Sequence, residues 1–227
     1  MGQPFIFMSA GGERISVVFE IFLRCGLKYD EANNMDNFNT AFGPLGYDKM
    51  DCSGTENEIR GMLRDFRKRA EADRIPHYGL RSGVGPCNVR WGILSMLLEE
   101  EWPDAIWIST MKRPAGPYIN QNGQTSRNEF TVGGWMTVIA SRREMVLSNG
   151  YVLPIPLVFK GKRMKKIVEF FGLQWNDSAD TLLTNELDFL LTTPIAHKSI
   201  EKEFMWICRQ TEEHFREGGL NINLITE

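Results

Sequence analysis

Residues 4–26, PFIFMSAGGERISVVFEIFLRCG, decide the fold of this chain of 227 residues. The compact apolar run Pro4–Met8 ends at the small residues of Ser9–Gly12, which is typical of a buried strand that runs into a loop. Beyond the glycines, apolar side chains recur at helical spacing until Gly26: Ile15, Val18, Phe19, Phe22 and Leu23. The stretch therefore predicts a strand, a glycine loop and a helix.

The same alternation of short apolar runs and amphipathic stretches continues along the chain. Further strands are predicted at 77–80, 105–110 and 151–159, and Pro154 and Pro156 make the last an edge strand or a partly irregular one. Helical patterns are predicted at 55–73, 86–101, 128–149, 162–171, 180–191 and 204–215. Strands separated by helices are typical of a mostly parallel sheet with both faces covered. We therefore expect an α/β, three-layer fold, with the polar stretch 28–50 as a surface loop or lid.

The composition is that of an ordinary globular protein, with 42% apolar and 24% charged residues. A net charge of -3 argues against a protein that coats nucleic acid or membrane, so we expect neither as a partner. Neither a signal peptide nor an apolar span of about 18 residues is found, which predicts a cytoplasmic protein. Four scattered cysteines, without C-x-x-C or zinc spacing, predict reduced structural thiols and no metal site: Cys25, Cys52, Cys87 and Cys208.

The glycine turn after the first strand is a candidate anion site. Free N–H groups and the helix dipole at a strand-to-helix turn favour a ligand such as phosphate. The spacing matches neither the dinucleotide fingerprint G-x-G-x-x-G nor the Walker A loop. A plain strand-to-helix turn is the alternative.

In order and spacing, several stretches resemble the P-loop sulfotransferases. IFMSAGGERISVVFEIFLRCGL, residues 6–27, resembles the strand, R-S-G-T-[ST] loop and helix that open that family. HYGLRS at 77–82 resembles its second strand, and WGILSMLLEEEWPDAIWISTMKRP at 91–114 its helix, F-P-D-A turn, strand and R-D-P. YVLPIPLVFKGKRMKKIVEFFGLQWND at 151–177 resembles the strand, link and helix that follow. The resemblance spans roughly 4–177 of one domain covering 1–227, and the helical part 178–227 diverges.

This resemblance implies a Rossmann-like P-loop fold and an enzyme. Such an enzyme transfers the sulfuryl group of 3'-phosphoadenosine-5'-phosphosulfate (PAPS) to a hydroxyl of a carbohydrate or small-molecule acceptor, leaving 3'-phosphoadenosine-5'-phosphate. Lys112 matches the family's 3'-phosphate-binding Arg and Asn120 its partner Ser, a pairing that suits a dianion. A solvated Lys112-Arg113 pair and a simple loop Asn120 are the alternatives. The loop matches the segment that wraps the 5'-phosphosulfate: Ser9, Ala10, Gly11, Gly12, Glu13, Arg14, Ile15 and Ser16.

The loop departs from the family at its cation. The family has Lys or Arg where this chain has Gly12, and that charge stabilises the transferred group. Arg14 is the candidate substitute, although its place in a first helical turn also suits exposure to solvent. Glu13 would repel a phosphosulfate unless it turns away.

A general base must accept the acceptor's proton. The family's His is absent from Arg81-Ser82-Gly83, and other branches use a carboxylate after the first helix. The candidates are Asp30, Glu31 and, less favoured, Asp36, each with a surface carboxylate as the alternative, together with His77.

Near the end of the chain, His214-Phe215-Arg216-Glu217-Gly218-Gly219 resembles the family's Phe-Arg-Lys-Gly loop, which makes Arg216 a cofactor candidate. A helix C-cap at Gly218-Gly219 is the alternative. A non-catalytic binding or assembly module that has lost the loop cation is the second hypothesis for function. A nucleotide kinase is the weakest, because the Walker lysine is missing.

Overall fold

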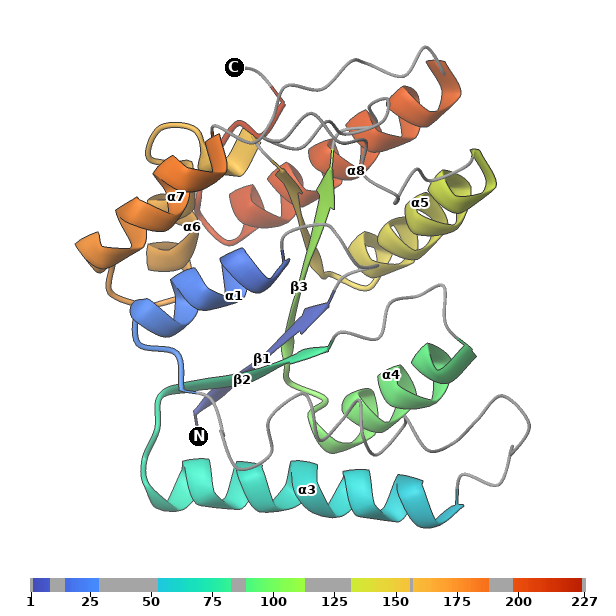
Figure 1. Ribbon diagram of the computed structural model, residues 1–227, viewed down its shortest axis with the longest axis vertical. Helices are drawn as coiled ribbons and strands as arrows, with labels where there is room; N and C mark the ends of the chain where they lie inside the picture. Colours follow the sequence, from blue (N-terminus) through green and yellow to red (C-terminus); the bar gives the residue numbers. More distant parts are fainter. Residues whose placement is uncertain are drawn as a thin grey trace.

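The computed structural model describes residues 2–8, 15–28, 53–82, 89–112, 132–155, 157–187 and 198–225. Its centre is a four-stranded sheet made of β1 (Gln3–Met8), β2 (His77–Ser82), β3 (Ile106–Lys112) and β4 (Tyr151–Ile155). The strands pair in parallel in the order β2-β1-β3-β4 (Figure 1). The expected three-layer α/β fold with a parallel sheet is confirmed.

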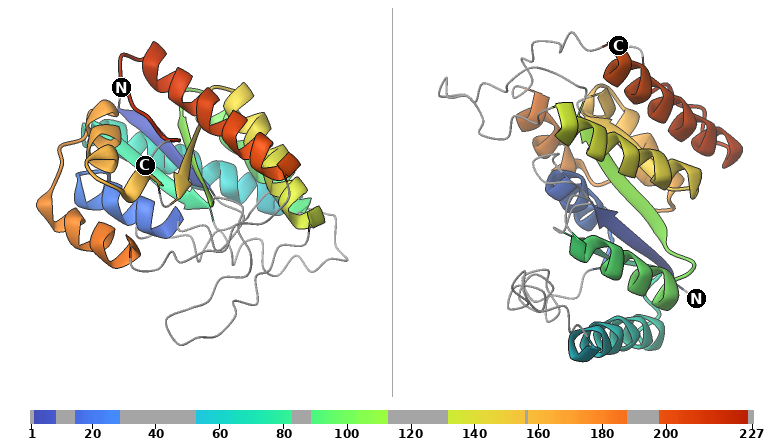
Figure 2. Two further views of the ribbon diagram at one scale, coloured as in Figure 1. Left: turned by 90° about the horizontal axis from the view of Figure 1, so that it is seen from above. Right: turned by 90° about the vertical axis from the view of Figure 1, so that its right-hand side faces the viewer.

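Helices cover both faces of this sheet (Figure 2). They are α1 (Ile15–Arg24), α3 (Ser53–Ala72), α4 (Val89–Glu101), α5 (Val132–Leu147), α6 (Arg163–Phe170), α7 (Asp180–Leu187) and α8 (Lys198–Glu217). Two 3-10 turns, η2 (Leu157–Phe159) and η3 (Asp177–Ala179), complete the described elements. No helix in these described segments is long and apolar enough to cross a membrane.

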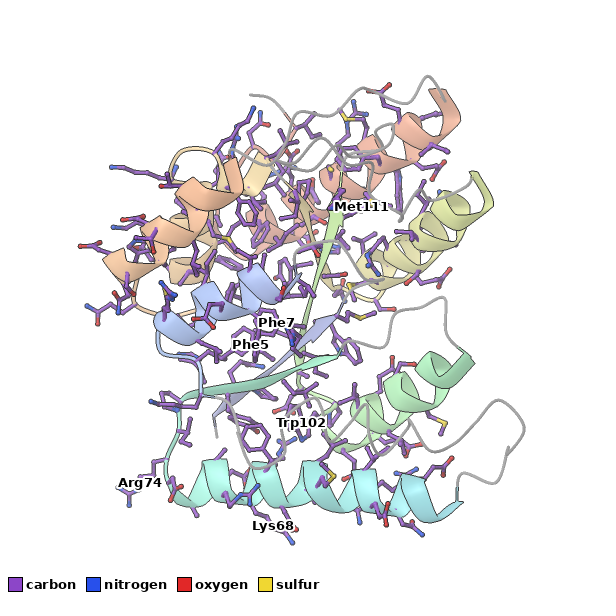
Figure 3. The ribbon with its side chains drawn as sticks, viewed as in Figure 1. Phe5, Phe7, Lys68, Arg74, Trp102 and Met111 are labelled. Atoms are coloured by element: carbon purple, nitrogen blue, oxygen red, sulfur yellow. The ribbon has the colours of Figure 1, made fainter. Side chains whose placement is uncertain are left out.

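Side chains along β1 point alternately to the two faces of the sheet, so the core has two sides. Phe5 and Phe7 point to the side covered by α1, α6 and α7, which we call the α1 face (Figure 3). Ile6 and Met8 point to the opposite side, the α4 face, where α3, α4, α5 and α8 pack. Both sides of the sheet are buried, which explains why the strands read as nearly continuous apolar runs.

Strand β4 ends earlier than its apolar run. The sequence predicts a strand over 151–159, but β4 stops at Ile155 and Leu157–Phe159 forms a 3-10 turn. All three side chains of that turn are buried, so the apolar run reflects burial rather than extended backbone. The predicted edge position of β4 is confirmed by the strand order.

The end of α8 has the geometry of a helix C-cap. The helix ends at Glu217, Gly219 has φ 93°, and the N–H of Leu220 donates to the carbonyl of Phe215 at 2.7 Å. This is a glycine-dependent helix C-cap. Two described cysteines, Cys25 and Cys208, are buried and form no disulfide with each other.

Candidate functional site

The strand order predicts a ligand-binding crevice at the carboxyl ends of β1 and β3. The chain leaves β1 toward β2 on one side and then crosses to β3 on the other, so the direction of winding reverses between β1 and β3. Open α/β sheets bind ligands at the carboxyl ends of the strands at such a point. We call this region, formed by Met8 and by Ser109–Lys112, the switch point; Figure 3 labels Met111 at this end of β3.

Buried polar side chains gather at the switch point. In the described part of the chain, four polar or charged residues are buried, all with 0% exposure: Ser109, Thr110, Arg142 and Thr211. The first two lie in the second half of β3, and Arg142 of α5 donates to the Thr110 carbonyl. Burying a polar or charged group is costly unless it has partners or a use. Their gathering at the crevice therefore marks it as the candidate site.

The pairing of β3 with the edge strand β4 shows which way the backbone N–H and carbonyl of Thr110 point. The N–H of Val152 donates to the Thr211 hydroxyl of α8 at 3.3 Å, so it faces away from β3. The backbone N–H and carbonyl of Leu153, the next residue, therefore point toward β3. In a parallel ladder Leu153 bonds to the residues that flank its partner Thr110. The N–H and carbonyl of Thr110 consequently face the other way, toward β1.

Arg142 occupies the space just beyond the end of β1. The β1–β3 ladder stops at Met8 and Ser109, so the Thr110 carbonyl points past the last residue of β1. Arg142 donates from Nε to this carbonyl at 3.1 Å, and from Nη1 to the Ser141 hydroxyl at 3.4 Å. A fully buried arginine thus donates to a carbonyl that points past the last paired residue of β1.

The two hydroxyls of β3 play different parts. Ser109 donates from Oγ to the Met8 carbonyl at 2.6 Å and ties the end of β1 to β3. The Thr110 side chain alternates with it and points to the α1 face, as does Ile108. Its Oγ1 is buried and finds no hydrogen-bond partner in the described structure. Thr110 is therefore a polar group available to a ligand at this edge.

Other predicted site residues lie at or near this edge. Lys112 is the last residue of β3 and is partly buried. Ser16 is exposed in the first turn of α1, whereas Ile15 is buried in the α1-face core and serves packing. The remaining candidates lie outside the described residues: Ser9, Ala10, Gly11, Gly12, Glu13, Arg14, Asp30, Glu31, Asp36 and Asn120.

His77 is not brought to the switch point. It begins β2 opposite Gln3, while Met8 pairs with Ser82 at the other end, about 16 Å away at the usual rise per residue. Its ring meets Phe5 edge-on at 6.1 Å between centroids, and its Nδ1 is buried without a partner in the described structure. The geometry therefore places the half-buried His77 against Phe5 at the amino edge of the sheet.

Arg216 also lies at the amino edge. His214, two residues earlier on α8, has Nδ1 3.2 Å from the carbonyl of Gly150, which precedes β4. Arg216 itself is exposed and pairs with Glu213 on the same helix. The structure thus does not bring Arg216 together with Lys112.

A groove of about 850 Å³ adjoins the switch point on the α4 face, between α4 and α5. Trp107 of β3 lines it, and Glu99 and Glu144 contribute exposed carboxylates from the two helices. Met8 and Ser141 also line it, and both contact the polar cluster of the switch point. The groove is therefore continuous with the neighbourhood of Arg142.

The sequence contained a signal for the residues that its analysis missed. Ser109-Thr110 interrupts an apolar strand shortly before Lys112, with only Met111 between them. Arg142 falls on the apolar stripe of α5, whose other members are buried: Val138, Ile139, Met145 and Val146. The candidate site therefore combines cations, hydroxyls and a helix N-terminus, a set suited to an anion.

Comparison of the chain with models of protein families, with curated proteins and with solved structures finds no match.

Proposed function

We propose that the protein binds PAPS at the switch point and transfers its sulfuryl group to a hydroxyl of a carbohydrate or small molecule. One observation carries the proposal. Three of the four buried polar residues in the described structure, Ser109, Thr110 and Arg142, lie near the carboxyl ends of β1 and β3. The choice of PAPS among anionic ligands comes from the resemblance in the order and spacing of the sequence.

Each part of the ligand has a candidate partner. The 5'-phosphosulfate would lie on the loop before α1, and the 3'-phosphate would lie near Lys112, where a cation suits a dianion. The acceptor oxygen attacks sulfur, the bond from sulfur to the 5'-phosphate oxygen breaks, and adenosine 3',5'-bisphosphate leaves. A carboxylate of Asp30 or Glu31 is the candidate base for the acceptor's proton.

The groove between α4 and α5 offers the acceptor a place next to the transferred group. Its end at Met8 and Ser141 borders the switch point, and the partly buried indole of Trp107 provides an apolar surface for a ring. A compact molecule with a hydroxyl would fit this volume better than an extended polymer.

A non-catalytic binding module is the second candidate function. It is favoured by Gly12, which stands where a loop cation would stabilise charge on the transferred group. The enzyme requires both nucleotide binding and turnover, whereas a binding or assembly module requires no turnover. They differ in turnover, so consumption of PAPS with a panel of hydroxyl acceptors separates them.

Lys112→Ala tests the nucleotide site. We expect calorimetry to show adenosine 3',5'-bisphosphate bound to the native protein and bound roughly 10- to 100-fold more weakly to the variant, because a charge-assisted bond is lost. Lys162→Ala, which removes an exposed lysine before α6, is the matched control and should bind normally. Equal affinity in Lys112→Ala would remove Lys112 from the site, and no binding at millimolar nucleotide would end the proposal.

A further inference from the structure

We infer that the groove between α4 and α5 binds an organic cation, that is, an ammonium group attached to an apolar body about the size of a ring system. The ammonium group would lie near Glu99 and Glu144, and the apolar body would lie along the floor at Trp107. The inference goes beyond the proposed function, because it holds whether or not the protein binds a nucleotide at the switch point.

The two carboxylates lie at the end of the groove that is nearer the amino edge of the sheet. Glu99 is in the last turn of α4, which leads into β3, and Glu144 is in the last turn of α5, which leads into β4. Because each helix ends a few residues before a parallel strand begins, these last turns lie near the amino ends of the strands. Met8 lines the groove at its other end, on the carboxyl edge.

No ion pair within the described segments neutralises these two carboxylates. By contrast, Glu101, two residues beyond Glu99, pairs with Arg60 and Arg64. The last turns of α4 and α5 hold no basic residue. A carboxylate near a helix C-terminus adds to the negative end of the helix dipole, which a cation stabilises. Two such helix ends therefore make this part of the groove favourable to a positive charge.

The rest of the lining favours an organic cation over a metal ion. Among the described residues, no group of three side chains could hold a metal ion. Four apolar residues line the groove: Pro103, Ala105, Trp107 and Met145. An indole attracts both apolar surface and cations. The volume of about 850 Å³ is typical of a site for a small molecule.

Glutamates that serve only to solvate the two helices are the alternative. They would not distinguish a cation from a neutral molecule of the same shape. Three indoles with the same ring and similar side chains test this difference: tryptamine carries an ammonium group, tryptophol a hydroxyl and indole-3-propionate a carboxylate. Calorimetry at low ionic strength, without nucleotide, measures the affinity of the native protein for each of them.

We expect tryptamine to bind the native protein at least 10-fold more tightly than tryptophol, and indole-3-propionate to bind more weakly than either. Glu99→Gln and Glu144→Gln should each weaken tryptamine about 2- to 5-fold, as expected for exposed charge pairs, and the double variant should weaken it about 10-fold. The affinity for tryptophol should not change. Glu58→Gln, which alters an exposed carboxylate of α3, is the matched control and should bind all three indoles like the native protein.

Equal affinities for tryptamine and tryptophol would overturn the inference. Unchanged tryptamine affinity in the double variant would also overturn it, as would no binding at millimolar tryptamine. The double variant should still bind adenosine 3',5'-bisphosphate like the native protein, and Lys112→Ala should still bind tryptamine. A native protein that binds tryptamine but not the bisphosphate would support this inference and end the PAPS proposal, and the reverse result would do the opposite.

Discussion

The backbone and the side chain of Thr110 have different roles, one in the sheet and one in the candidate site. Its carbonyl lies past the end of β1 and accepts from Arg142, while its hydroxyl is buried on the other face without a partner in the described structure. An unsatisfied buried hydroxyl costs roughly 1–3 kcal/mol. A residue that destabilises the fold in this way, at the mouth of a crevice, is typical of a binding site.

Thr110→Val replaces this hydroxyl with a methyl group of similar size. We expect the free energy of unfolding to rise by about 1 kcal/mol, because the desolvation cost disappears, and anion affinity to fall. Thr211→Val is the matched control, since its hydroxyl accepts from the buried N–H of Val152 and its loss should lower stability by about 1–2 kcal/mol. Urea unfolding and calorimetry check both, and a destabilised Thr110→Val would show that its hydroxyl already has a partner.

Glu101 makes the stability of the fold depend on pH. Arg64 donates two hydrogen bonds of 2.7 Å to its carboxylate, and these bonds, assisted by Arg60, hold the pKa of Glu101 below its ordinary value of 4.5. A carboxylate with a lowered folded pKa stabilises the protein above its ordinary pKa, and this contribution is lost as the pH falls through the folded pKa.

Thermal unfolding should therefore lose stability more steeply below pH 4.5 in the native protein than in Glu101→Gln. Screening by water keeps this difference modest, because the pair lies near the surface. Glu99→Gln, which alters an exposed carboxylate on the same helix, is the control and should follow the native curve. Parallel curves for the native protein and Glu101→Gln would show that the pair does not shift the pKa.

Glycine stabilises the protein just after a helix, where φ is positive, and destabilises it within a helix. Gly219 follows α8 with φ 93°, a conformation that a Cβ disfavours, whereas Gly61 lies within α3; an added Cβ at either position meets no atom within 4 Å. Gly219→Ala should lower the free energy of unfolding by about 1 kcal/mol, and Gly61→Ala should raise it by about 0.5–1 kcal/mol. Chemical denaturation of both variants checks the signs, and a stabilised Gly219→Ala would contradict the C-cap.

Prediction from the sequence was strongest for whole elements. Periodicity placed the four strands and the helices between them, because burial on both faces of a parallel sheet leaves long apolar runs. It failed at Leu157–Phe159, where burial without extended backbone gives the same pattern. The order of the strands, and hence the position of the switch point, depends on packing between elements that no single stretch encodes.

The site was predicted only in part for the same reason. The loop after β1 and Lys112 follow strands directly, so local sequence suffices to place them at the carboxyl edge. His77 and Arg216 lie at the amino edge because they begin a strand and end a helix that packs beside β4. Arg142 was missed because an arginine in a helix is ordinarily read as exposed.

At the scale of the whole molecule, the two edges of the sheet differ in character. The carboxyl edge holds the buried hydroxyls, Arg142 and Lys112. The amino edge is packed with aromatic rings, and Tyr151 lies 4.7 Å from Phe215 and 5.0 Å from Phe171 between centroids. The packed edge holds the strands in register, which lets the other edge carry polar groups that contribute little to stability.

The two edge strands of the sheet, β4 and β2, each have backbone groups that cannot pair with a further strand. On β4, Pro154 has no N–H to donate, and the N–H of Val152 is taken by Thr211. On β2, Lys28 donates to the carbonyl of His77 at 2.9 Å and accepts from the N–H of Gly79 at 3.0 Å. A strand from another molecule would therefore find few backbone groups with which to extend the sheet, and addition of strands at exposed edges is a common route to aggregation. In the described part of the chain, the polar groups thus lie at the carboxyl ends of the strands, while the sides of the sheet offer little to a further strand.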